Sequence, residues 1–153
     1  MTSGKLTVGL VQQECTANPH VNLETSVQGI REAAAKGAQL VVLQELHATR
    51  YFCQTENDNN FDLAEPVDGP TTRRLAGLAA ELRVVITASI FERRARGIYH
   101  NTAVVIDSNG AIAGKYRKMH IPDDPGYYEK YYFSPGDLGF RPINTSVGRL
   151  GEK

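Results

Sequence analysis

Two charged residues stand directly after predicted strands, where a side chain can reach a reacting group. Glu45 follows the apolar run Leu40–Leu43 by two residues, and active sites of open α/β sheets lie at the carboxyl ends of strands. Lys118 ends a basic cluster after another strand, and alternation puts Tyr116 and Lys118 on one face. A carboxylate and an ammonium there could serve acid–base and electrostatic catalysis. A solvated loop glutamate and a solvated basic rim are the competing interpretations.

A second glutamate, Glu129, is flanked by tyrosines on both sides. The segment is Tyr127-Tyr128-Glu129-Lys130-Tyr131-Tyr132, and such surroundings would remove part of the water around the carboxylate. An exposed ion pair between Glu129 and Lys130 explains the same pattern equally well.

The remaining nucleophiles and metal ligands give weaker signals. Cys53 has His47 nearby in the sequence, but a thiol beside Phe52 is more often a small buried apolar group. Cys15 is a weaker candidate still. The four histidines show no metal-ligand spacing. No GxGxxG, GxxxxGK[ST] or GxSxG motif is present, so nucleotide enzymes and serine hydrolases lose their main support.

Composition narrows the class of protein further. The 153 residues suit one globular domain. Lys plus Arg total 17 and Asp plus Glu total 17, so no net field favours nucleic acid or an anionic membrane as a partner. Apolar runs are far too short to span a bilayer, and residues 1–20 lack the apolar core of a signal peptide. Two cysteines without a CxxC motif favour a reducing compartment, and we therefore expect a cytoplasmic protein.

The order of elements predicts an α/β fold. Residues 6–11 form a β-rich run that predicts a buried strand. Asn18 and Pro19 suit a helix start, apolar residues follow at spacings of three and four, and Gly37 suits the helix end. Leu40–Leu43 is the next strand. A strand, a helix and a strand with tight connections predict a right-handed crossover between parallel strands.

The second half of the chain predicts an antiparallel extension of this sheet. A long connection over residues 44–70 precedes a helix capped by Thr71 or Thr72. Strands are expected over 84–91, 102–107 and 111–116, with Ser108-Asn109-Gly110 as a hairpin turn, and the sheet is therefore mixed. Residues 119–140 hold six of the twelve aromatics and predict an ordered, irregular loop. Residues 146–150 suit the opening of another strand.

Several segments together resemble the nitrilase, or carbon–nitrogen hydrolase, superfamily, and within it the N-carbamoylputrescine amidase branch. The similarity runs from about residue 5 to residue 151. The matching segments are Leu40-Val-Val-Leu-Gln-Glu-Leu46, Tyr51-Phe-Cys-Gln54, Tyr99-His-Asn-Thr-Ala103, Gly114-Lys-Tyr-Arg-Lys-Met-His-Ile-Pro-Asp-Asp-Pro-Gly126, Tyr128-Glu-Lys130 and Ser134-Pro-Gly-Asp137. This resemblance implies a four-layer α-β-β-α sandwich and a Glu–Lys–Cys catalytic set.

The resemblance also implies roles for individual residues. Glu45 matches the general base, Lys118 the cation beside the tetrahedral intermediate, and Glu129 a second active-site glutamate. The implied substrate is a small cationic ureido compound, N-carbamoylputrescine, and its hydrolysis gives putrescine, ammonia and carbon dioxide. Asp123, Asp124 and loop tyrosines such as Tyr128 could receive its amine. No metal or organic cofactor is implied. A related amidase, ureidopropionase or nitrilase activity would use the same Glu and Lys positions.

One departure from the superfamily pattern concerns the nucleophile. The family cysteine is expected a few positions after Lys153, and neither Cys15 nor Cys53 lies in its motif. We therefore expect residues 1–153 to be the N-terminal part of a single carbon–nitrogen hydrolase domain, with an incomplete sandwich and no activity alone. Partners would be a second copy of the chain, as a homo-oligomer, or a complementing C-terminal half. A non-catalytic binding or assembly module is the alternative. The hydrolase interpretation requires Glu45 and Lys118 to share one cleft.

Overall fold

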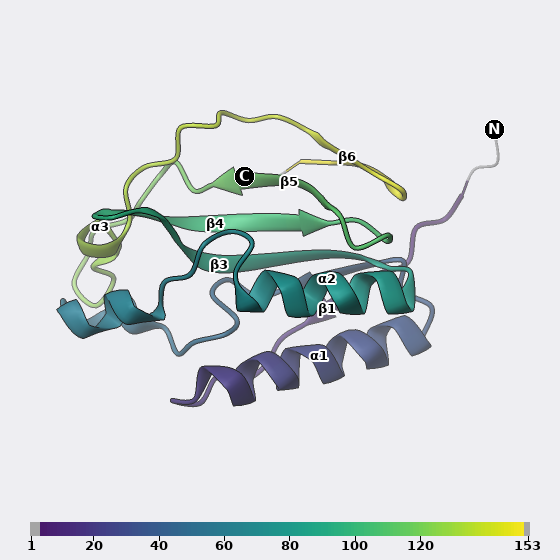
Figure 1. Cartoon of the computed structure of the whole chain (residues 1–153), viewed down its shortest axis with the longest axis horizontal. Coiled ribbons are helices and arrows are strands. Elements are labelled where there is room, and N and C mark those ends of the chain that lie inside the picture. The colour runs from purple at the N-terminus through teal and green to yellow at the C-terminus, as the bar shows by residue number, and fades with distance from the viewer. Residues whose placement is uncertain (1–3, 152–153) are drawn as a thin grey trace.

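A mixed five-stranded sheet forms the centre of the protein, as seen in a computed structural model that describes residues 4–151 (Figure 1). The strands follow chain order across the sheet. The first three are parallel and the last two are antiparallel to their neighbours, so the sheet is mixed, as the sequence predicted. The strands are β1 (Val8–Val11), β2 (Leu40–Leu43), β3 (Val85–Ala95), β4 (Ile98–Ile106) and β5 (Ile112–Arg117).

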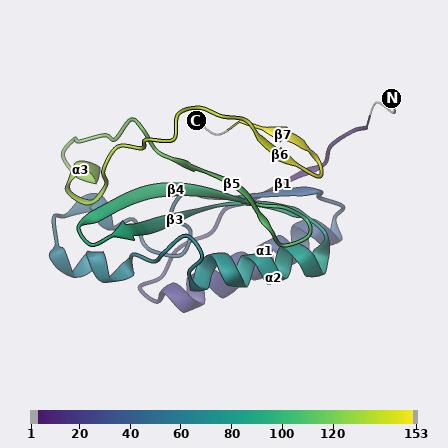
Figure 2. The ribbon, with the colours of Figure 1, turned by 45° about the horizontal axis from the view of Figure 1, so that its top comes forward.

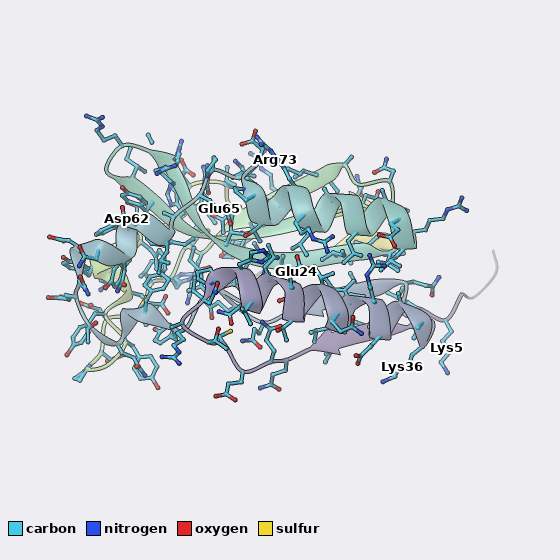
Figure 3. The ribbon with its side chains drawn as sticks, turned by 60° about the horizontal axis from the view of Figure 1, so that its bottom comes forward. Lys5, Glu24, Lys36, Asp62, Glu65 and Arg73 are labelled. Carbon is cyan, nitrogen blue, oxygen red and sulfur yellow. The ribbon has the colours of Figure 1, made fainter. Side chains whose placement is uncertain are left out.

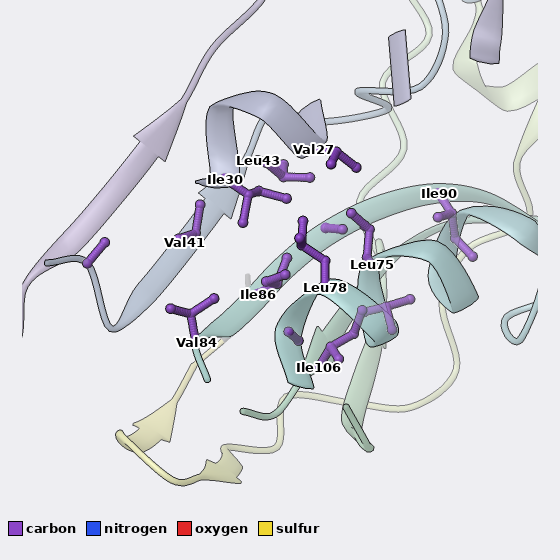
Figure 4. Close-up of a cluster of buried hydrophobic side chains, with 14 residues drawn as sticks. Val27, Ile30, Val41, Leu43, Leu75, Leu78, Val84, Ile86, Ile90 and Ile106 are labelled. Carbon is purple, nitrogen blue, oxygen red and sulfur yellow. The ribbon is translucent and has the colours of Figure 1, made fainter. Parts of the chain in front are cut away.

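Two helices, α1 (Pro19–Ala35) and α2 (Pro70–Leu82), cover one face of this sheet (Figures 1 and 3). Asn18 caps α1 through its side chain, and Pro19 occupies the first position, where no amide donor is needed. The helices and the sheet enclose the main core, in which each buried aliphatic side chain contributes about 1.5–3 kcal/mol (Figure 4). Its fully buried members include Ile30, Val41, Leu75, Leu78, Ile86 and Ile106.

The start of α2 differs from the sequence prediction. Gly69, and not Thr71 or Thr72, is the N-cap, and Pro70 is the first helical residue. Both threonines are buried within the first turn. The amide of Thr71 donates to Oε2 of Glu65 at 3.0 Å, so an upstream carboxylate caps the helix. Because the capping side chain lies upstream of the helix, no Ser or Thr at the N-cap position marks where the helix begins.

The prediction that the first strand is buried was wrong. In the described part of the chain β1 forms one edge of the sheet, and only its side toward α1 is covered. Gly9 lies on that side, where a Cβ would meet Cβ of Ala33 at 2.7 Å. Val8 and Leu10 point to the other face, and they remain 45% and 79% exposed.

Strands β3 and β4 extend further than the sequence predicted. They form a hairpin that turns near Gly97, which adopts a φ of +76°. This end of the hairpin is rich in polar residues, and Glu92 and His100 are buried within it. Polar residues obscure the alternation that identifies a strand, because burial of such groups depends on partners elsewhere in the chain.

A short hairpin covers part of the sheet face opposite the helices (Figure 2). It comprises β6 (Ile143–Thr145) and β7 (Gly148–Leu150), and Ile143 packs against Leu40, Val85 and Val105. The strand expected over 146–150 therefore begins at Gly148 and pairs back with β6. Of the four expected layers, residues 4–151 form one helix layer and one sheet. Glu152 and Lys153 lie outside the described residues.

The long loop between β2 and α2 and the long loop between β5 and β6 pack together at the end of the sheet where β2 ends. They contain the 3-10 helices η1 (Phe52–Gln54) and η2 (Asp58–Leu63) and the short helix α3 (Glu129–Tyr132). An aromatic cluster joins them, as expected from the composition of 119–140; its members include Phe52, Phe61, Phe91, Tyr132 and Phe133. This packing fixes the loops that carry residues of the site. Within residues 4–151, no helix is long and apolar enough to cross a bilayer.

Candidate active site

Glu45 lies in the loop that follows β2, two residues beyond Leu43. Its side chain is 52% exposed. The next residue, Leu46, adopts a φ of +51°, a left-handed conformation that is costly for a residue with a Cβ. The buried side chain of Leu46 packs in the aromatic cluster. This packing holds the turn and thereby directs Glu45 away from that cluster.

Lys118 follows β5 directly and bridges two carboxylates. Its Nζ donates to Oε1 of Glu45 at 2.9 Å and to Oε2 of Glu129 at 2.8 Å. Burial disfavours the charge, but the hydrogen bonds that Lys118 donates to both glutamates outweigh this effect, so the pKa of Lys118 is raised above its ordinary value. The ammonium is therefore charged throughout the neutral pH range.

Glu129 is the buried member of this set. Its side chain is 4% exposed, and it pairs with Lys118 and not with the adjacent Lys130. Its other oxygen, Oε1, accepts from Oη of Tyr51 at 2.9 Å. Burial and this hydrogen bond raise the pKa of Tyr51, which keeps the phenol as a donor. Glu129 thus holds Lys118 in place and has a donor on each oxygen.

A cleft of about 280 Å³ lies beside this set, on the sheet face opposite α1 and α2. Glu45 and Lys118 lie among its lining residues, and Val42, Ala103 and Tyr116 supply apolar surface. A half-exposed carboxylate beside a fixed ammonium can remove a proton from a nucleophile and stabilise a developing oxyanion. The structure therefore brings Glu45, Lys118 and Glu129 together, although 73 positions separate Glu45 from Lys118 in the sequence.

Two residues of this site were absent from the sequence-based candidates. Tyr51 contacts Glu129 as described, and Nδ2 of Asn101 donates to Oε1 of Glu45 at 2.5 Å. Asn101 lies on the same face of β4 as Ala103, so strand alternation could have pointed to it once the cleft face was known.

A buried ion pair lies behind Lys118 on the opposite face of the sheet. Arg117 makes two hydrogen bonds to Glu92, of 2.7 Å and 2.8 Å, and Thr102 donates to the same carboxylate. Asp137 also accepts from Arg117 at 3.0 Å. These contacts fix the end of β5 and hence the starting point of the Lys118 side chain. Arg117 is thus buried on the helix side of the sheet, whereas Lys118, which shares a face with Tyr116 as the sequence predicted, lines the cleft.

The expected substrate-binding residues Asp123, Asp124 and Tyr128 lie in the loop between β5 and α3. Asp123 and Asp124 are exposed, and Asp124 and Tyr127 form a backbone-paired turn. Tyr128 precedes α3, and its amide donates to the carbonyl of Cys53 at 2.8 Å. Within residues 4–151, no side-chain hydrogen bond links Asp123, Asp124 or Tyr128 to Glu45 or Lys118.

Neither cysteine is set up as a nucleophile. Cys53 is fully buried, and burial together with the charge of Glu129 raises its pKa to about 12. Sγ of Cys15 lies 3.3 Å from the carbonyl oxygen of His47, and Nε2 of Gln44 donates to it at 3.4 Å. In the described part of the chain, no group of three or more His, Cys, Asp or Glu residues could hold a metal ion.

Comparison with known proteins gives a consistent result. The family model for carbon–nitrogen hydrolases matches residues 7–152. A relative from Oryza sativa subsp. japonica, named N-carbamoylputrescine amidase, is 45% identical over 148 residues, which are 96% of this chain and 49% of the relative. A relative from Francisella tularensis, named citrullinase, is 41% identical over 145 residues, which are 94% of this chain and 50% of the relative.

The crystal structure of a carbon–nitrogen hydrolase from Helicobacter pylori G27 also matches the fold. The TM-score is 0.91 and the identity is 49%, over 95% of this chain and 50% of that one. The chain therefore spans about half the length of the relatives that it matches.

Proposed function

Because this chain belongs to the carbon–nitrogen hydrolase family, we propose that it supplies the base and the oxyanion-stabilising cation for hydrolysis of a ureido C–N bond. The first candidate substrate is N-carbamoylputrescine, which the name of the rice relative specifies. The observation that carries this proposal is the Lys118 ammonium bridging Glu45 and Glu129 beside the cleft. The nucleophile is a cysteine outside residues 1–153.

The chemistry explains why these groups are needed. A ureido carbon is electron-rich, so a thiolate attacks it more readily than water does. Glu45 takes the thiol proton, the S–C bond forms, and the carbonyl electron pair moves to oxygen beside Lys118. The tetrahedral intermediate collapses, and the departing nitrogen takes the proton from Glu45. Glu45 then takes a proton from water as the water oxygen attacks the acyl carbon, the C–S bond breaks, and the leaving sulfur regains the proton from Glu45.

The products follow from the same atoms. From N-carbamoylputrescine, one nitrogen leaves when the thioester forms, and hydrolysis of the thioester releases a carbamic acid. This carbamic acid loses carbon dioxide and frees the second nitrogen, so the products are putrescine, ammonia and carbon dioxide. Glu129 accepts from Lys118 on one oxygen and from Tyr51 on the other, and it therefore positions the ammonium rather than moving protons. In this proposal, Asp123, Asp124 and Tyr128 bind the cationic amine of the substrate.

The missing thiol is tested with the chain alone and with a joined enzyme. In the joined enzyme, Lys153 is followed by the C-terminal half of the Helicobacter pylori hydrolase, whose N-terminal half is 49% identical to this chain. We expect ammonia release from N-carbamoylputrescine only with the joined enzyme, and at least about 10²-fold less with Glu45→Gln or Lys118→Met. Turnover by the 153-residue chain alone, free of other chains, would contradict the missing thiol.

Citrulline is the second candidate substrate, because the Francisella relative is named citrullinase. Citrulline carries the same terminal ureido group but adds an α-carboxylate. Asp123 and Asp124 would repel that carboxylate and attract a simple amine. The ratio of kcat/KM for N-carbamoylputrescine to kcat/KM for citrulline separates the candidates. If the ratio favours N-carbamoylputrescine, the double variant Asp123→Asn, Asp124→Asn should lower it.

A further inference from the structure

The two donors on Glu45 share one oxygen. Nδ2 of Asn101 lies 2.5 Å from Oε1, and Nζ of Lys118 lies 2.9 Å from the same atom. Among the described residues, no hydrogen bond reaches Oε2. A carboxylate held in this way has one oxygen fixed by the protein and one with its lone pairs free for an incoming proton.

The amide of Asn101 is itself oriented by Ser89. The backbone amide of Leu46 donates to Oγ of Ser89 at 3.2 Å, and that hydroxyl donates its proton to Oδ1 of Asn101 at 3.1 Å. Because the Ser89 hydroxyl donates to Oδ1, Nδ2 is the side-chain atom of Asn101 that faces Glu45. The opposite orientation of the amide would place Oδ1 of Asn101 against Oε1 of Glu45, and both atoms are acceptors.

These bonds close a ring through the backbone. The ring runs from Glu45 to its neighbour Leu46, across β3 at Ser89, across β4 at Asn101, and back to Glu45. It ties the left-handed turn at Leu46 to the middle strands of the sheet. The position of the Glu45 carboxylate therefore depends on the sheet and not only on its own exposed loop.

We propose that Asn101, oriented by Ser89, is a positioning residue that fixes Oε1 of Glu45 and leaves Oε2 to act on the thiol and the water. This role rests on the proposed function. It acts on the geometry of proton transfer, so substitutions should change kcat more than KM. A misplaced catalytic group can cost about 10²-fold in rate.

The first test is a double-mutant cycle in the joined enzyme. Asn101→Ala should lower kcat by about 10–100-fold, with KM within a factor of about three. Ser89→Ala should act in the same direction and more weakly, because Asn101 remains. In the Glu45→Gln background, Asn101→Ala should cause no further loss, because it acts through that carboxylate. Where turnover is too slow to measure, the rate at which the nucleophilic cysteine is alkylated reports how well Glu45 removes its proton.

A variant that adds a negative charge provides a matched comparison. Asn101→Asp keeps the side-chain size but replaces the donor with a second carboxylate beside Glu45, so it should lower kcat more than Asn101→Ala does. Asn144→Asp makes the same change on β6, where Asn144 is exposed, and kcat should stay as in the unaltered enzyme. Equal kcat for Asn101→Asp and the unaltered enzyme would overturn the positioning role.

A spectroscopic measurement on the 153-residue chain does not depend on turnover. The side-chain amide protons of Asn101 should shift and exchange faster with solvent in Glu45→Ala and in Ser89→Ala, with circular dichroism confirming the fold. Unchanged amide signals would overturn the ring. If the unaltered joined enzyme is folded but releases no ammonia, the proposed function fails; if it is active and Asn101→Ala retains kcat, only the positioning role fails.

Discussion

At the scale of single residues, the site depends on one cation shared by two carboxylates in different surroundings. Glu45 is about half exposed, whereas Glu129 is buried and accepts a hydrogen bond on each oxygen. Two chemically identical side chains therefore take different roles. In the function that we propose, the exposed one acts as the base and the buried one holds Lys118 in place.

The contribution of Tyr51 can be measured by removing only its hydroxyl. Tyr51→Phe leaves Oε1 of the buried Glu129 without its donor, and we expect the free energy of unfolding to fall by about 1–3 kcal/mol. Urea denaturation measures this change. Tyr127→Phe is the matched control, because the ring of Tyr127 is 5.9 Å from that of Tyr51 and its side chain is exposed. Equal losses in both variants would contradict the role of the hydroxyl.

Cys53 gives a second prediction at this scale. Its raised pKa of about 12 and its complete burial predict that iodoacetamide at pH 8 leaves Cys53 unmodified in the folded chain. The same reagent should modify it readily in the urea-unfolded chain. Peptide mass spectrometry identifies the modified residue. Rapid modification of Cys53 in the folded chain would argue that it is accessible to substrate.

At the scale of elements, the polar end of the β3–β4 hairpin and the end of β5 are joined by a buried ion pair. Glu92 on β3 and Arg117 on β5 are 2% and 5% exposed, and Lys118 follows Arg117 directly. Burial opposes the charge on Glu92, but the hydrogen bonds from Arg117 and Thr102 outweigh it, so its pKa is lowered. Because side chains alternate along a strand, Arg117 lies on one face of the sheet and Lys118 on the other.

This pair predicts a pH-dependent contribution to stability. Because the pKa of Glu92 is lower in the folded chain, the pair stabilises the fold above the ordinary pKa of 4.5 and loses this contribution as the pH falls through the folded value. Glu92→Gln should lower the free energy of unfolding at pH 7 by about 3 kcal/mol, since it leaves Arg117 buried without this partner.

Urea denaturation at pH 7 and at pH 3 measures the effect, and the difference between the variant and the unaltered chain should shrink at the lower pH. Glu56→Gln, at an exposed position, should change stability little at either pH. A loss of equal size at both pH values would show that the charge of Glu92 is not its cause.

At the scale of the whole molecule, one face of the sheet is only partly covered. The helices cover one face, and the β6–β7 hairpin covers one end of the other. Leu10 and Val8 remain exposed on the cleft side of the sheet, on β1, whose outer edge is unpaired among the described residues. An apolar sheet face and a free strand edge both favour association with another chain.

We therefore expect the 153-residue chain to self-associate unless a complementing C-terminal half covers this face. Light scattering over a concentration series measures the association, and Leu10→Lys should weaken it. Val21→Lys introduces the same charge on α1, on the opposite side of the molecule, at a residue that is 48% exposed, and should leave the association unchanged. A monodisperse monomer of the unaltered chain would contradict this expectation.

The sequence alone determined the features that depend on neighbouring residues. Apolar periodicity located both long helices and most strands, Asn18 and Pro19 fixed the start of α1, and the end of β2 pointed to Glu45. Such features follow from backbone propensity and from the period of a helix or strand, which short segments contain.

Only the tertiary structure decided which polar groups meet. The partners of Glu45 lie 56 and 73 positions away, and Tyr51 and Glu129 are 78 positions apart. Glu129 is buried because a distant ammonium and phenol compensate its charge, and β1 is exposed because no element packs over its outer face among the described residues. Burial of a charge is a property of its partners in space, so no local pattern of residues contains it.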